Sequence, residues 1–201
     1  MEEKSPKKSR QEALQAIRKR EKRSKTLRNS VIAVALVGII GFLVYNRTQT
    51  VGTLVEPMDS ADHVPDGTAI EYSTNPPTSG MHYDNPMPAG FYAQDSPEAT
   101  QLEHPESYVV HSLEHGYVVI WYNCNGLDDA ACQSLTDEIK GILQEYSAKV
   151  IAFPWPNMQE NVVMTAWSIE QRFESGFDPQ LAAKFIEANR SNPRAPEPYV
   201  D

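Results

Sequence analysis

The sequence HSLEHGYVVIWY, residues 111–122, places two imidazoles and a carboxylate directly before the most strand-like run in the chain. The run from Tyr117 to Tyr122 is apolar on both faces, as expected for a strand that is covered on each side of a sheet. We therefore expect a central strand here, with candidate metal ligands or acid–base groups at its N-terminal end.

Downstream of this strand the sequence becomes regular. We expect a helix from Ser134 to about Ser147, strands over 149–153 and 162–168, and a final helix from Asp178 to about Asn189. The short loop between the second and third strands predicts an antiparallel hairpin, and the intervening helix allows the first two strands to be parallel. The predicted fold class is α+β (mixed α/β), a small mixed sheet with helices on one face.

Residues 56–105, upstream of the strand, have no helical period and are rich in turn formers, such as the run NPPTSG at 75–80. Yet Tyr72, Tyr83 and Phe91 are spread through them, and disordered linkers have few aromatic residues. We expect an ordered but irregular, loop-rich lobe that wraps over the sheet.

The charge of the chain is strongly asymmetric. Residues 1–29 carry eleven Lys and Arg against four Asp and Glu, a balance of +7. Residues 46–201 carry seven against twenty-three, a balance of −16, which would repel nucleic acid. The two parts are therefore expected to lie in different surroundings.

The uncharged run Val31–Tyr45 between them is close to the length that crosses a bilayer. We expect a single transmembrane helix over 30–46, and the positive-inside rule then keeps the basic segment 1–29 in the cytoplasm. The chain is thus predicted to be a single-pass protein of the cell membrane, with a linker over 47–62 and an extracytoplasmic domain over 63–201.

Only two cysteines occur, Cys124 and Cys132, and both lie in the exported part. An oxidising exterior favours a disulfide between them. The alternative is a metal-binding or redox pair, but seven intervening residues is not a redox spacing, and the acidic residues between them would not favour a thiolate. We expect a structural disulfide.

All five histidines also lie in the exported part, and we expect His63 and His104 to be surface residues. His111 and His115 are four positions apart. On a straight strand they would lie about 13 Å apart, too far for one ion, whereas on a helical turn they become neighbours. A shared site therefore requires a turn here, which could end at Gly116.

A second histidine motif, Met81-His82, lies in the irregular segment. Thioether and imidazole together suit copper, whereas three histidines and solvent would suit zinc. The predicted metal ligands are His82, His111, His115, Glu114 and Met81, for copper slightly ahead of zinc. The alternative is that each histidine is buried and hydrogen-bonded, fixing the lobe to the sheet.

The residues His111-x-x-Glu114-His115 also match a zinc-peptidase pattern, which normally lies on a long helix. Because Gly116 and a β-branched run follow at once, we do not expect a long helix. No nucleophile elbow, phosphate-binding glycine loop or dinucleotide fingerprint occurs either. No catalytic residue is predicted.

Three motifs carry a resemblance to a known family: NPPTSG-x-HY at 75–83, G-x-Y at 90–92 and HSLEHG-x-VVI at 111–120. Together with Ala166-Trp167 and Ala195-Pro196-Glu197, they resemble the bacterial domain-of-unknown-function family 3105 over about residues 65–198. The resemblance implies that the two histidine motifs belong to one domain, which commonly follows a single membrane anchor. It implies no reaction.

We therefore expect a non-enzymatic, membrane-anchored extracytoplasmic domain that binds copper or zinc, with Glu114 as an accessory ligand or as a residue that orients the histidines. The second hypothesis is a structural or interaction module of a cell-envelope complex, whose histidines only pack and whose partner is another envelope protein. The third is a small metallohydrolase.

Overall fold

The computed structural model describes residues 29, 32, 34–40 and 51–200 of the chain. The chain divides into two compact units, Met1–Gln49 and Thr50–Asp201. The predicted basic segment lies outside the described residues apart from a helical position at 29, and so does the predicted anchor apart from helical positions at 32 and 34–40. Within the described part, no helix combines the length and apolarity needed to cross a bilayer.

The second unit is built on a six-stranded mixed sheet with the strand order β1-β6-β5-β3-β4-β2. The strands are β1 (Thr53–Leu54), β2 (Gly90–Phe91), β3 (Val118–Tyr122), β4 (Val150–Pro154), β5 (Val162–Ala166) and β6 (Ile169–Arg172). The predicted α+β class is confirmed. Residues 53 and 54, in the segment expected as a linker, form an edge strand that pairs with β6.

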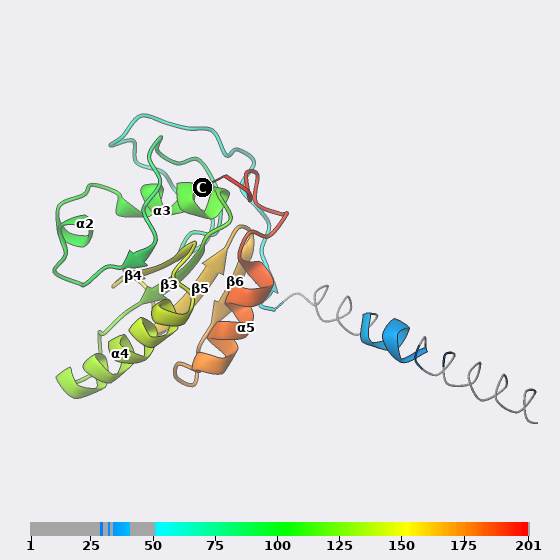
Figure 1. Cartoon of the computed structure of the whole chain (residues 1–201). Coiled ribbons are helices and arrows are strands. Elements are labelled where there is room, and N and C mark those ends of the chain that lie inside the picture. Colours follow the sequence, from blue (N-terminus) through cyan, green and yellow to red (C-terminus); the bar gives the residue numbers. More distant parts are fainter. Residues whose placement is uncertain (1–28, 30–31, 33, 41–50, 201) are drawn as a thin grey trace, which may run out of the picture. The chain divides into compact units, whose positions relative to one another are not determined.

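Helices cover both faces of this sheet (Figure 1). The helices are α2 (Pro97–Thr100), α3 (Pro105–Glu114), α4 (Asp129–Glu145) and α5 (Pro179–Asn189). Side chains of α4 and α5 pack on one face, whereas α3 and the irregular lobe pack on the other. The prediction of helices on one face was therefore wrong, because α3 lies in a stretch whose helical character was not recognised.

Strand β3 shows why other elements must pack on both faces of the sheet. Val118 and Ile120 join the core under α4 and α5, while Val119 and Trp121 join the core under α3. All five residues of the strand are buried. An uninterrupted apolar run is what a strand between two layers requires.

The order of the strands departs from the prediction at one place. Strand β3 is parallel to β4, as the intervening α4 allowed, but β3 also lies between β4 and β5 and pairs with β5 antiparallel. The expected hairpin of β4 and β5 does not form. Instead β5 makes a hairpin with β6 through the two residues Trp167 and Ser168, and β6 had not been predicted.

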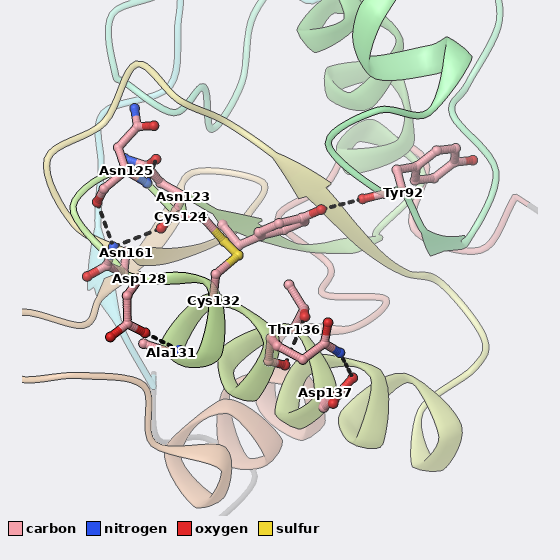
Figure 2. Close-up of a disulfide and its surroundings, with 12 residues drawn as sticks. Tyr92, Asn123, Cys124, Asn125, Asp128, Ala131, Cys132, Thr136, Asp137 and Asn161 are labelled. Carbon is pink, nitrogen blue, oxygen red and sulfur yellow. Dashed lines mark hydrogen bonds between the residues drawn. A yellow bond between two sulfur atoms is a disulfide. The ribbon is translucent and has the colours of Figure 1, made fainter.

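Helix α4 begins earlier than expected. Asp128 accepts a hydrogen bond from the backbone N–H of Ala131 (2.8 Å) and caps the helix, so Ser134 lies inside it. The predicted disulfide between Cys124 and Cys132 is confirmed, and it ties the first turns of α4 to the chain just after β3 (Figure 2).

The expected irregular lobe is confirmed between β1 and α3, where most residues lie in turns, bends or segments without regular secondary structure. Hydrogen bonds fasten it to α3: the Met87 N–H donates to the carbonyl of Tyr108 (3.0 Å), and the Ser112 hydroxyl donates to the carbonyl of Met87 (2.7 Å). These contacts fix the lobe against the helix that carries the second histidine motif.

Candidate metal centre

The end of α3 positions the motif HSLEHG. The Gly116 N–H donates to the carbonyl of Leu113 and the Tyr117 N–H donates to that of Ser112, both at 3.0 Å, which is the Schellman pattern of helix termination. Gly116 has a φ of +76°, which glycine adopts without a steric penalty. His111 and Glu114 therefore lie on the last helical turn and His115 at its end, so the turn that a shared site requires is present.

The irregular lobe supplies the histidines that lie beside His111. His63 and His82 form an isolated parallel bridge, in which the Val64 N–H donates to the His82 carbonyl (2.8 Å). The ring centroids of His63, His82 and His111 lie 4.7–4.9 Å from one another. His82 is fully buried, whereas the His63 side chain is 45% exposed and opens the cluster to solvent.

Two groups of candidate ligands share one carboxylate. His63, His82, His111 and Glu114 each offer a ligand atom within 4.8 Å of the others, and we call this the inner group. Glu114, His115 and Glu197 meet the same criterion, and we call this the outer group.

The inner histidines are oriented through their Nδ1 atoms. The Nδ1 of His82 lies 2.9 Å from the Gly80 carbonyl, and the Nδ1 of His111 lies 2.6 Å from the Tyr83 carbonyl. The Nδ1 of His63 lies 3.0 Å from a carboxylate oxygen of Asp84. Carbonyl and carboxylate oxygens only accept hydrogen bonds, so these Nδ1 atoms carry the proton and Nε2 remains for a ligand.

The Nε2 atoms of His82 and His63 lie 2.9 Å and 3.5 Å from the same carboxylate oxygen of Glu114. A neutral imidazole with its proton on Nδ1 presents a lone pair at Nε2, and an ionised carboxylate also presents only lone pairs. Two such acceptors repel each other at 2.9 Å unless a proton or a cation lies between them. The geometry thus calls for positive charge at this point.

Burial lowers the pKa of His111, and the like charges that His82, His115 and His63 would carry lower it further, while the hydrogen bond to the Tyr83 carbonyl partly opposes this. The lowered pKa favours the neutral ring. Neutral imidazole is the form that binds a metal.

The structure brings together three of the predicted site residues, His82, His111 and Glu114. His115 lies in the outer group, and its Nε2 is 3.2 Å from the Nε2 of His111. Met81 lines a surface hollow with residues that include Met58, and its carbonyl accepts a hydrogen bond from the Tyr72 hydroxyl (3.0 Å). The role of Met81 as a ligand stays a prediction.

Two members of the groups were missed in the sequence. His63 was expected to be a surface residue, and only its pairing with His82 across the lobe brings its ring to Glu114. Glu197 lies in the Ala-Pro-Glu motif already noted, and this was the signal that could have drawn attention to it. His104 lies outside both groups, with its Nδ1 3.4 Å from Glu106.

A family model described as protein of unknown function (DUF3105) matches residues 63–201. The chain belongs to the DUF3105 family. The match begins at His63 and extends beyond Glu197, so both groups lie within the DUF3105 domain. No curated protein and no solved structure matches the chain.

Proposed function

We propose that this protein is a membrane-anchored extracytoplasmic domain that binds a transition-metal ion through the inner group. The observation that carries the proposal is the orientation of the three imidazoles. Each has its Nδ1 against an oxygen acceptor, and two of the three direct Nε2 to the Glu114 carboxylate. Metal-binding histidines typically donate their other N–H to a carbonyl or carboxylate in this way.

The spacing of the donor atoms supports the proposal. A tetrahedral ion with ligands at about 2.0–2.1 Å holds its ligand atoms about 3.3 Å apart. The 3.5 Å separation of His63 Nε2 from Glu114 is close to that value, and the 2.9 Å separation of His82 Nε2 would open by a few tenths of an ångström. Small rotations of the Glu114 side chain supply such a change.

The chemical types of the donor atoms limit which metal ions the inner group can bind. Three imidazole nitrogens and one carboxylate oxygen suit a divalent ion of the zinc or copper(II) type. Copper(I) prefers soft sulfur and would draw on the thioether of Met81. The experiment below therefore offers zinc and copper(II) separately.

The membrane topology of the protein is part of the same proposal. The basic balance of residues 1–29 and the apolar run that follows support an anchor with the DUF3105 domain outside the membrane. In intact spheroplasts, added protease is expected to cleave the domain and to spare residues 1–29. Protection of the domain would contradict this topology.

A second candidate is a structural or interaction module of a cell-envelope complex, and one observation favours it. The Nδ1 of His111 on α3 donates to the Tyr83 carbonyl of the lobe, and a proton between His82 of the lobe and Glu114 of α3 would satisfy both side chains without a metal. In that case the histidines act only as buried hydrogen-bonded links.

Metal retention separates the two candidates. The full-length protein, without a polyhistidine tag, is stripped with a chelator, loaded with zinc or copper(II), desalted, and analysed for metal per chain. We expect at least one ion per chain and thermal stabilisation. At a free metal concentration one hundred times Kd, binding stabilises the folded state by about 2.7 kcal/mol.

The variants His63→Ala and Glu114→Gln are expected to lose the ion of the inner group, and the matched control His104→Ala is expected to retain it. The His63 side chain is half-exposed, so its loss should leave the domain folded, as circular dichroism would verify. A wild-type protein that retains no metal and gains no stability, while still folded, would favour the structural module.

A further inference from the structure

We infer that the outer group is a second divalent-cation site, so that the domain holds a pair of ions bridged by Glu114. The inference rests on the proposed function, because the second ion would share a carboxylate with the first. The outer ligands would be His115 and Glu197, with Glu114 supplying the shared carboxylate. Such sharing is typical of two-metal sites, whose ions lie about 3.5–4 Å apart.

The distances support two neighbouring ions. His115 Nε2 lies 3.5 Å from a carboxylate oxygen of Glu197, close to the separation of about 3.3 Å that two ligands of one tetrahedral ion have. His115 Nε2 also lies 3.2 Å from the Nε2 of His111, which belongs to the inner group. No ligand atom of His115 lies within 4.8 Å of every member of the inner group, so one ion cannot bind all of these donors at their present positions.

The two ring nitrogens of His115 are not both satisfied by the described residues. The side chain is 10% exposed, and its Nδ1 is buried with no hydrogen-bond partner among the described residues. If its proton is on Nδ1, that N–H has no acceptor and the Nε2 lone pair faces the lone pair of His111 Nε2. If the proton is on Nε2, the buried Nδ1 lone pair has no donor.

Neither neutral form of His115 therefore satisfies both of its nitrogens. With the proton on Nδ1, a cation on the Nε2 side removes the contact between the two lone pairs, so that only the Nδ1 N–H is left without a partner among the described residues.

The outer carboxylate is held in place by the tail of the chain. The Glu197 N–H donates to the Glu114 carbonyl (3.0 Å), and the ammonium of Lys149 donates to the carbonyls of Pro198 and His115, both at 3.1 Å. These bonds fix the Glu197 backbone beside the end of α3. Its side chain is 54% exposed, which gives an ion access from solvent.

The test is the number of ions per chain, measured by native mass spectrometry of the full-length protein titrated with zinc. We expect two ions in the wild type, and one in Glu197→Gln and in His115→Ala. Because Glu197 is exposed, Glu197→Gln should fold even if His115→Ala does not. Glu174→Gln, which changes an exposed carboxylate after β6, is the matched control and should keep two ions.

Copper(II) gives a second readout. Two carboxylate-bridged copper(II) ions couple magnetically, so the paramagnetic resonance signal per copper should be weaker in the wild type than in Glu197→Gln. One ion in both the wild type and Glu197→Gln would overturn this inference and leave the proposed function standing. Two ions in both would place the second ion elsewhere and also overturn it. No ion in the wild type would overturn both proposals.

Discussion

At the scale of single residues, one buried hydrogen bond links two strands in the core below α3. The indole Nε1 of Trp121, a fully buried side chain on β3, donates to the hydroxyl of Thr165 on β5 at 2.7 Å. The two residues are diagonal neighbours on adjacent strands, because β3 and β5 pair with Trp121 opposite Val163 and Val119 opposite Thr165. The sequence pattern gave no sign of this contact, since it depends on which strands are neighbours.

Replacing Thr165 with Val keeps the shape of the side chain and removes the acceptor. The buried N–H of Trp121 is then unsatisfied, which should lower the free energy of unfolding by about 1–3 kcal/mol. Urea denaturation measures the change. Thr136→Val, on α4 with its hydroxyl bonded to the Gln133 carbonyl of its own helix, should change it by less than about 0.5 kcal/mol. Equal effects in the two variants would contradict the prediction.

Gly116 is the residue that joins the histidine motif to β3. Its Cα position leaves no room for a side chain, because an added Cβ would lie 2.9 Å from the Cα of Ser191 and 3.2 Å from that of Pro198. The sequence predicted that the turn ends here, but the close approach of the tail is a tertiary contact. The glycine therefore serves both the backbone conformation and the packing.

Gly116→Ala is expected to destabilise the domain by more than the roughly 1–2 kcal/mol that a left-handed backbone costs a non-glycine residue. Gly126→Ala is the matched control, since Gly126 has a φ of +83° but an added Cβ there would meet no atom within 4 Å. The difference between the two unfolding free energies isolates the close approach. A difference near zero would show that the tail moves aside without cost.

At the scale of elements, the local sequence signals predicted one helix start correctly and two incorrectly. The N-terminus of α5 was predicted correctly because Asp178 caps it and Pro179 occupies its first position. The start of α4 was placed too late because Ser134 was taken as the cap, although Asp128 lies at the true boundary. Helix α3 was missed because the lobe's turn formers continue to Pro105, which in fact begins the helix.

The disulfide between Cys124 and Cys132 holds the start of α4 covalently. It closes a loop between residues that are eight positions apart, and removing it in Cys124→Ser/Cys132→Ser should cost about 2–3 kcal/mol in the chain-entropy model. The unfolding free energy of the double variant, compared with that of the oxidised wild type, measures the cost. Reducing agent should bring the wild type to a similar value and leave the variant unchanged. An unchanged stability in the variant would contradict the prediction.

At the scale of the whole domain, the tail after α5 completes the region around the candidate metal centre. The Ser191 N–H donates to the Gly116 carbonyl (2.8 Å), and Lys149, which precedes β4, donates to three carbonyls from His115, Pro198 and Val200. Three parts of the chain that are far apart in sequence thus meet at the end of α3. This junction supports both Glu114 and Glu197.

Lys149→Met should release the tail while it keeps most of the apolar length of the side chain. Bonds from a charged donor are worth about 1.5–3 kcal/mol, so we expect the amides of Ser191 and Glu197 to exchange hydrogen roughly ten to a hundred times faster. Hydrogen–deuterium exchange with mass spectrometry measures this. Lys184→Met, at an exposed position on α5, is the control and should leave the tail protected. Unchanged exchange in Lys149→Met would contradict the role of the ammonium.

The sequence by itself determined the buried central strand, the disulfide, the irregular lobe and the turn that ends at Gly116, because each depends on residues close together in the chain. It also indicated that the motifs around His82 and His111 belong together. Only the tertiary structure decided that β3 separates β4 from β5, that α3 covers the second face, and that His63 and Glu197 join the ligand groups. These features depend on contacts between distant segments, and such contacts follow from packing rather than from local pattern.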